Sequence, residues 1–274
     1  MQSILVATDF SDASLNAARY AAVLSRKTGA GLTLLHVFML PTPVGEMPYV
    51  MVSAEEIQAE HEKQIAKLAA DLEPIAGKKI NTLVNIGMPA DEIVYQTEEL
   101  KTDLVVSGMQ GTNSALDKFI GSTTAAIIRK SKVPVLVIPA GHSYESIHSI
   151  TFATDFNDVM NEKSFHLLQD WLSANPDVLL QIVHIQQPGE DLSDSQANSK
   201  SGLQQRLQQV KHLFFHEKHD SVEDGLDQFL STHPSQLLVM ITHRHSWWHR
   251  LLNSSHTTEM AYRAEGPLLV LQNK

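Results

Sequence analysis

Short apolar runs alternate with stretches of helical periodicity along the first half of the chain. Runs rich in Val, Ile and Leu predict five strands, at residues 3–7, 31–37, 80–86, 104–107 and 135–138. Between them, apolar positions at helical spacing and polar-faced stretches predict helices, at residues 12–27, 54–72, 90–100 and 122–130. Strands that are apolar throughout are typical of a parallel sheet buried on both faces. The pattern therefore predicts an α/β fold with helices on both sides of the sheet.

The second half repeats this order. The segment ILVATDF at residues 4–10 returns as ITFATDF at 150–156, and PVLV at 134–137 returns as PLLV at 267–270. A repeat of this length indicates a duplicated domain, so we expect two tandem α/β domains, at 1–140 and 146–274. The repeat is weakest at residues 186–209, where a polar stretch predicts a loop and a short helix.

Composition and charge narrow the classes of function. The chain has 274 residues and no cysteine, which excludes disulfides and thiolate chemistry. Its formal net charge of −10 argues against a nucleic-acid partner. No apolar run is long enough to span a bilayer, and the amino terminus lacks the pattern of a signal peptide. We therefore expect a cytoplasmic protein with no membrane partner.

A glycine-rich segment follows the fourth predicted strand, with the pattern Gly108-x2-Gly111-x9-Gly121-Ser122. Glycine lets the backbone approach a ligand, and the start of the next helix directs N–H groups and a positive dipole end at an anion. The hydroxyls of Ser122 and Thr123 can add hydrogen bonds to phosphate oxygens. The alternative is that these glycines only form turns. The complete pattern, placed between a strand and a helix, favours a phosphate site.

An acidic residue is predicted to face this segment. Asp9 follows Thr8 at the end of the first strand, which lies beside the fourth strand in a sheet of this kind. Its carboxylate can accept hydrogen bonds from ribose hydroxyls, as acidic residues do in dinucleotide-binding folds. The two features together predict a nucleotide site.

These motifs resemble the universal stress protein family in its ATP-binding branch, in a tandem two-domain form. The resemblance implies doubly wound domains with five parallel strands in the order 3-2-1-4-5, of the adenine-nucleotide alpha-hydrolase-like type. It implies ATP or a related adenine nucleotide, with or without Mg²⁺, as the ligand. The implied nucleotide-binding residues are Thr8, Asp9, Val37, Ser107, Gly108, Gly111, Gly121, Ser122 and Thr123. Of these, Asp9 is expected near the ribose, Val37 near the adenine, and the glycines with Ser122 and Thr123 near the phosphates.

The resemblance also bears on assembly. Domains of this family pair through their fifth strands, and in a tandem chain this pairing can occur within one molecule. A homodimer of the tandem chain is left open as well.

The second half departs from the glycine pattern. Aligned from Pro134 and Pro267, its segment carries Ile241, Arg244 and Ser254 where the first half has glycines. Side chains at these places occupy the space that a phosphate needs, so we expect this half not to bind ATP in the same manner. The alternative is that Arg244 supplies charge in place of backbone donors.

Histidines mark the second half, and their chemistry admits two interpretations. A cluster lies within the altered segment, at His243, His245, His249 and His256, and a second group shares one face of a probable strand, at His212, Phe214 and His216. A metal site is one interpretation, but no familiar zinc spacing is present, so solvated or capping histidines are favoured. His36 and His184 recur at matching places in both halves, which favours a packed, hydrogen-bonded role over a catalytic one.

Three functions remain in competition. The first is a stress-response regulatory module that binds adenine nucleotide in its first domain and uses the second domain for pairing. The second is a slow ATPase, although the chain has no Walker lysine and no kinase-type catalytic loop. The third is a nucleotide-free interaction module. The intact glycine pattern favours the first, and no catalytic residue is assigned.

Overall fold

The computed structural model describes residues 1–40, 53–111, 118–157, 162–242 and 266–273. The elements of the first half are β1 (Ser3–Ala7), α1 (Asp12–Thr28), β2 (Gly31–Phe38), α2 (Ala54–Ala76), β3 (Asn81–Ile86), α3 (Pro89–Glu99), β4 (Leu104–Gly111), β5 (Lys118–Phe119), α4 (Ser122–Lys130) and β6 (Val135–Pro139). Those of the second half are β7 (Ser149–Ala153), α5 (Glu162–Ala174), β8 (Leu179–Gln186), α6 (Asp194–Arg206), β9 (His212–Lys218), α7 (Val222–Thr232), β10 (Leu237–Thr242) and β11 (Leu268–Gln272).

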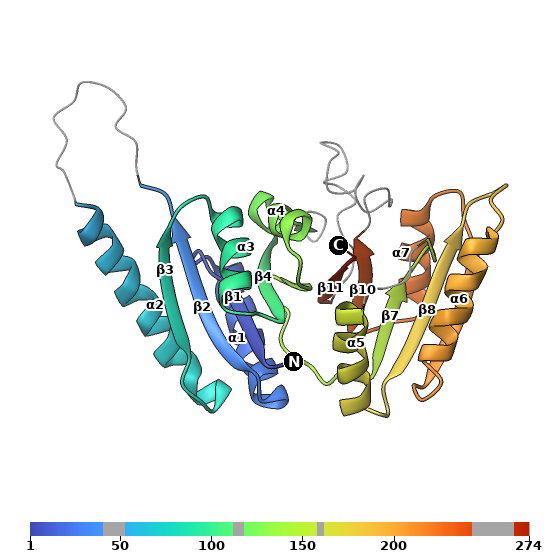
Figure 1. The fold of residues 1–274 in the computed structure, drawn as a ribbon, viewed down its shortest axis with the longest axis horizontal. Helices are drawn as coiled ribbons and strands as arrows, with labels where there is room; N and C mark the ends of the chain where they lie inside the picture. The colour runs from blue at the N-terminus through green and yellow to red at the C-terminus, as the bar shows by residue number, and fades with distance from the viewer. Residues whose placement is uncertain (41–52, 112–117, 158–161, 243–265, 274) are drawn as a thin grey trace, which may run out of the picture.

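One continuous sheet runs through the molecule, with helices on both of its faces (Figure 1). Its main path is β3-β2-β1-β4-β6-β11-β10-β7-β8-β9. Pairing is parallel within each half and antiparallel only between β6 and β11 along this path. Each half thus has the strand order 3-2-1-4-5, which confirms the expected tandem, doubly wound α/β fold.

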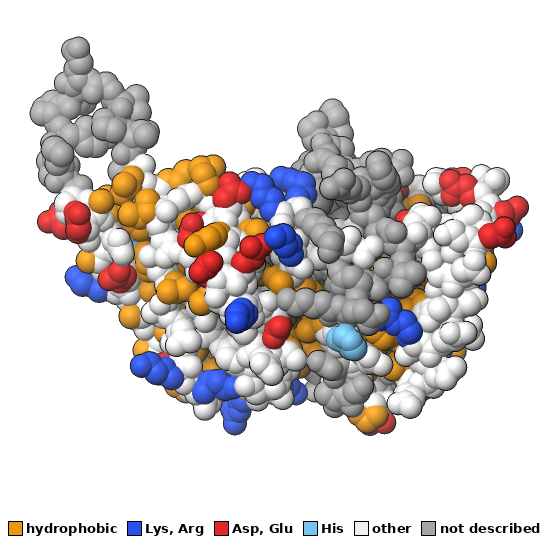
Figure 2. Space-filling model, in the orientation of Figure 1, with side chains coloured by type: hydrophobic (Ala, Val, Ile, Leu, Met, Phe, Trp, Pro, Cys, Tyr) orange, Lys and Arg blue, Asp and Glu red, His pale blue; other side chains and the backbone are white. Residues whose placement is uncertain are grey.

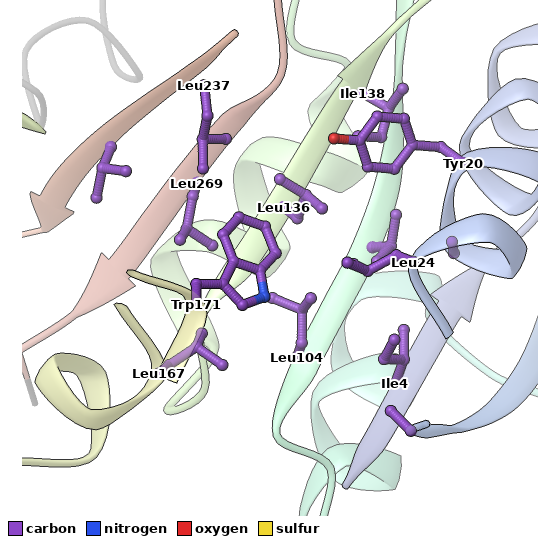
Figure 3. Close-up of a cluster of buried hydrophobic side chains, with 14 of the residues drawn as sticks. Ile4, Tyr20, Leu24, Leu104, Leu136, Ile138, Leu167, Trp171, Leu237 and Leu269 are labelled. Atoms are coloured by element: carbon purple, nitrogen blue, oxygen red, sulfur yellow. The ribbon is translucent and has the colours of Figure 1, made fainter. Parts of the chain in front are cut away.

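The two halves share a hydrophobic core at their junction. Leu136 of β6 and Leu269 of β11 are partners in the antiparallel register, and both are fully buried. Tyr20 from α1 and Trp171 from α5 enter the same cluster from opposite sides (Figure 3). The antiparallel strand pairing and this cluster join the halves into one continuous structure.

Helix α2 extends beyond its predicted end at residue 72. Pro74 lies inside it, and the helix ends at Gly77, whose φ of 68° is left-handed and whose N–H donates to the carbonyl of Glu73 at 2.8 Å. A proline removes one helical hydrogen bond. Leu72 and Ala76 bury apolar surface on either side of it, which offsets part of this loss.

The glycine-rich segment begins within strand β4, which extends beyond its predicted end at residue 107. Strand β4 continues to Gly111, and its last two residues pair antiparallel with β5, with Gln110 opposite Phe119 and Gly111 opposite Lys118. Residues 108–111 read GMQG, which lacks the apolar run that predicts a strand. They pair with β5 and, at Gly108 and Met109, with Ile138 and Pro139 of β6, and local periodicity does not reveal such pairings.

Candidate functional site

The turn after β1 forms one wall of the site. Thr8 is buried, and its hydroxyl lies 3.1 Å from the Ser14 hydroxyl and accepts from the Phe10 N–H at 3.1 Å. Phe10 has a φ of 64°, a left-handed value that is rare for a bulky residue. This tight turn leaves the Asp9 side chain exposed at the carboxyl edge of the sheet.

Hydrogen bonds hold the Asp9 carboxylate in its charged form. Ser11 donates to Asp9 Oδ1 from its hydroxyl at 2.6 Å and from its N–H at 3.1 Å. Partial burial acts to raise the pKa of Asp9, but the hydrogen bonds from Ser11 and Ser14 outweigh it, so the pKa lies below its usual value. The result is an oriented, ionised hydrogen-bond acceptor.

The opposite wall is formed by β4 and the start of α4. The hydroxyls of Ser107 and Thr124 lie 2.8 Å apart, and Thr124 also donates to the carbonyl of Gly108 at 3.1 Å. Gly121 is the N-cap of α4 and has no side-chain capping bond. The amino end of this helix therefore opens toward the site with its dipole uncapped by a side chain.

Two glycines of the motif have different physical roles. A Cβ on Gly108 would lie 2.6 Å from the backbone C and O atoms of Ala13, so glycine there allows α1 to approach β4. A Cβ on Gly121 would have no atom within 4 Å, and the φ of Gly121 is −57°. Gly108 thus serves packing of the fold, while Gly121 borders open space. Neither glycine has a positive φ.

The walls enclose a cavity of about 420 Å³ at the carboxyl ends of β1 and β4. The sequence-predicted residues that line it are Thr8, Asp9, Val37, Ser107, Gly108, Gly121, Ser122 and Thr123. Gly111 lies farther along β4, in its pairing with β5. The fold thus brings together residues that lie far apart in the sequence, such as Thr8 and Thr123.

Several other cavity-lining residues were not predicted from the sequence. Ser14 and Thr124 hydrogen-bond the predicted residues from within α1 and α4, and Pro89 and Ile93 of α3 close one side. The shared edge of parallel strands is the signal that could have found α3, because it follows the carboxyl end of β3. Among the described lining residues, Asp9 is the only charged side chain.

Exposed apolar side chains border this edge of the sheet. Met39 follows β2 and Met88 precedes α3, with 61% and 62% of their surface exposed, and Ile86 is also exposed. Figure 2 shows hydrophobic side chains gathered on this face of the first half, interspersed with acidic ones. Met88 is adjacent to Pro89, which lines the cavity. Met39, Ile86 and Met88 thus make part of the rim beside the cavity apolar.

A buried histidine supports the turn. His36 of β2 donates from Nδ1 to the Thr8 carbonyl at 2.8 Å, and its ring lies 4.5 Å from that of Phe10. Burial lowers the pKa of His36, and the nearby ring of His61 lowers it further. In the second half, His184 makes the same contact with the Thr154 carbonyl at 3.0 Å. These contacts confirm the packed, hydrogen-bonded role predicted for His36 and His184.

Comparison with known proteins identifies the family. Residues 1–139 match the sequence profile described as "Universal stress protein family". The chain belongs to the universal stress protein family. A universal stress protein of Methanocaldococcus jannaschii is 31% identical over 144 residues, which are 50% of this chain and 81% of that protein.

Two further proteins resemble the chain along almost its whole length. A universal stress protein of Synechocystis sp. is 24% identical over 305 residues, covering 99% of this chain and 100% of its own. The crystal structure of a universal stress protein from Archaeoglobus fulgidus superposes with a TM-score of 0.70 at 15% identity, covering 99% of this chain and 96% of that one. The structural likeness shows that the tandem fold is shared.

The second half of this universal stress protein keeps the turn but not the glycines. Asp155 accepts from the N–H of Asn157 at 3.1 Å and from its side-chain amide at 2.9 Å. Ile241, at the place of Gly108, lies in β10 and is buried. Arg244 and Ser254 lie outside the described residues. The described part therefore retains an acidic turn beside a strand that carries a bulky side chain.

The two groups of histidines in the second half differ in whether the structure describes them. The cluster at His243, His245, His249 and His256 falls outside the described residues. His212 and His216 lie in β9, where His216 contacts Gln186 and the ring of His184 is 5.3 Å away. In the part of the chain that is described, no three metal-ligating side chains come together, and no helix is long and apolar enough to cross a membrane.

Proposed function

We propose that residues 1–140 bind ATP or a related adenine nucleotide in the 420 Å³ cavity. Asp9 accepts from the ribose hydroxyls, Val37 contacts the adenine, and the phosphates lie at Gly121, Ser122 and Thr123 at the start of α4. One observation carries the proposal. The open space beside Gly121 faces an uncapped helix terminus, in a cavity that also holds an ionised carboxylate.

The chemistry of the walls defines how the phosphates are held. Gly108, Gly111 and Ser107 extend the site along β4, and Thr8 completes the turn. No lysine or arginine lines the described part of the cavity, so backbone N–H groups, hydroxyls and the α4 dipole supply the attraction. Such a site leaves most of the phosphate charge uncompensated, which favours Mg²⁺ as a companion of the nucleotide.

The second domain, at residues 146–274, acts in regulation rather than in ATP binding. Strand β4 carries Ser107 and Gly108 and pairs with β6, and β6 pairs with β11 of the other domain. This path joins the nucleotide cavity to the domain junction through two strand pairings. Nucleotide occupancy is therefore proposed to alter the pairing of the domains or the apolar rim beside the cavity, in a stress-response role.

Isothermal titration of the full chain with ATP and Mg²⁺ tests this proposal. We expect one site per chain, and we expect Gly121→Val to abolish binding because its side chain enters the cavity. Gly202→Val is the matched control, since a Cβ at Gly202 also meets no atom within 4 Å but lies on α6. Two equivalent sites per chain, or unchanged binding by Gly121→Val, would contradict the proposal. A phosphate-release rate well above background would favour the ATPase alternative.

A further inference from the structure

A side chain of the second half hydrogen-bonds the helix that borders the nucleotide cavity. Gln272, in β11, is fully buried, and its Nε2 donates to the carbonyl of Ile128 in α4 at 3.2 Å. Its Oε1 accepts from the hydroxyl of Thr242, in β10, at 2.9 Å. The amide is thus oriented within its own domain and directed at a helix of the other domain.

The pattern of β11 explains why a glutamine reaches α4. Alternate residues of a strand share one face, so Leu268, Val270 and Gln272 lie on the same side of the sheet. Leu268 and Val270 belong to one buried hydrophobic cluster with Ile128 of α4. A glutamine on such a face needs hydrogen-bond partners, because an unpaired buried polar group costs about 1–3 kcal/mol. The Ile128 carbonyl and the Thr242 hydroxyl meet this need.

The contact satisfies a carbonyl that the helix itself leaves without a donor. The last four carbonyls of an α-helix have no intrahelical partner, and α4 ends at Lys130. The N–H of Ser131 donates to the carbonyl of Ile127 at 2.8 Å, and Gln272 donates to that of Ile128. Gln272 is therefore a capping group for the carboxyl end of α4, and the second domain supplies it.

The opposite end of the same helix faces the cavity. Residues 121–124 line the cavity, and the Thr124 hydroxyl lies 2.8 Å from that of Ser107 in β4. The 9 residues of α4 span about 14 Å. A short helix that is attached near both ends has a fixed axis. Thr124 thus fixes where α4 begins, and Gln272 fixes the direction in which its N–H groups and its dipole point.

The matching place in the first half cannot make this contact. In the alignment of the two halves, Gln272 corresponds to Pro139. The strand register agrees, because each pairs with the equivalent residue of its neighbouring strand, Thr242 and Met109 respectively. A proline side chain has no hydrogen-bond donor. The glutamine contact is therefore specific to the second domain, which directs it at the first.

We propose that Gln272 is a positioning residue for the nucleotide site, which holds α4 in the direction that brings its N–H groups to the phosphates. This inference rests on the proposed function, and it gives the second domain a defined part in nucleotide binding. Adenosine has no phosphate, and its proposed partners are Asp9 and Val37. Adenosine binding is therefore independent of the direction of α4.

Isothermal titration of the full chain, with ATP and Mg²⁺ and separately with adenosine, tests the proposal. Gln272→Met keeps the length of the side chain and removes both hydrogen bonds of the amide. We expect its ATP affinity to fall about two- to tenfold, the loss of one hydrogen bond, with adenosine affinity unchanged. In the ligand-free variant, amide hydrogen exchange across residues 122–130 should become faster. Thr242→Val removes only the hydroxyl that orients Gln272 and should weaken ATP binding in the same selective way.

Gln181→Met is the matched control. Gln181 is also a buried strand residue of the second domain, and its Nε2 donates to the Ser149 hydroxyl at 3.0 Å, within that domain. This variant should lower Tm without changing ATP affinity or hydrogen exchange in α4.

The outcomes separate this inference from the proposed function. The inference is overturned by wild-type ATP affinity or unchanged α4 exchange in Gln272→Met, or in Thr242→Val if the first variant does not fold. An equal loss of adenosine affinity, or an equal loss of ATP affinity in Gln181→Met, overturns it as well, because the effect would then be general destabilisation. Absence of ATP binding by the wild-type protein would overturn the proposed function and the inference together.

Discussion

Replacing Gly108 by alanine separates the packing role of a motif glycine from a ligand-binding role. The added Cβ would lie 2.6 Å from both the C and O atoms of Ala13, about 1 Å inside the optimal carbon contact of roughly 3.5–4.0 Å. Both obstructing atoms are backbone, so no side chain can turn away. Relief requires α1 to move away from β4.

The expected cost follows from that displacement. Overpacking of a close-packed interior costs typically about 1–3 kcal/mol. For proteins of roughly 150–250 residues, each kcal/mol lowers Tm by about 2–4 °C. We therefore expect Gly108→Ala to lower Tm by about 2–12 °C in differential scanning calorimetry. The displaced α1 also carries Ser14, so ATP binding should weaken as well.

Gly121→Ala is the companion variant. A Cβ there meets no atom within 4 Å, so its Tm should fall less than that of Gly108→Ala, only by the poorer N-cap preference of alanine, while its ATP affinity in isothermal titration should fall. The reasoning is refuted if Gly108→Ala melts like the wild-type protein, because α1 would then not be in contact with β4. Equal losses of Tm in the two variants would refute the division of roles.

Three other changes test single contacts. Thr124→Val leaves the Ser107 hydroxyl without this buried partner and should cost about 1–3 kcal/mol in urea unfolding, whereas Thr124→Ser should restore most of it. Because the pKa of His36 is lowered in the fold, its neutral form contributes stability that is complete above the unfolded pKa of about 6.5 and is lost as pH falls through the folded pKa. The urea midpoint of His36→Asn should thus depend less on pH, between pH 7.5 and 5, than that of the wild-type protein, and an unchanged slope would refute this. Lys132→Met should change the free energy of unfolding by only ~0–1 kcal/mol, since the ion pair of Lys132 with Glu98 is exposed. A larger decrease in the free energy of unfolding would contradict this.

The elements were largely predictable from sequence because apolar periodicity is a local property. The helix predicted at residues 12–27 and the observed α1 differ by a single residue at the end. The strand order needed more than periodicity, since strand neighbours are set by contacts between distant residues. It followed here from the family resemblance, and the register between β6 and β11 emerged only from the structure.

The candidate site was predictable in composition but not in the role of each residue. Residue type alone cannot distinguish Gly108 from Gly121, because their difference lies in the distance to α1. Ser14 and Thr124 are ordinary helical positions in the sequence, and only the three-dimensional arrangement brings their hydroxyls to Thr8 and Ser107. Hydrogen-bond partners of this kind depend on where the helices pack, so the surrounding sequence does not predict them.

The duplicated turn shows which part of the motif belongs to the fold and which to the ligand. Phe10 and Phe156 both have left-handed φ values, of 64° and 54°, and each ring packs on the buried histidine of the next strand. A strained conformation of this kind costs on the order of 1–3 kcal/mol and persists only where its surroundings enforce it. The second half keeps this conformation although Ile241, in β10, stands where the first half has Gly108. The Thr-Asp-Phe turn is therefore a structural feature of each domain, and the proposed difference in nucleotide binding between the two halves rests on the segment that begins at Gly108.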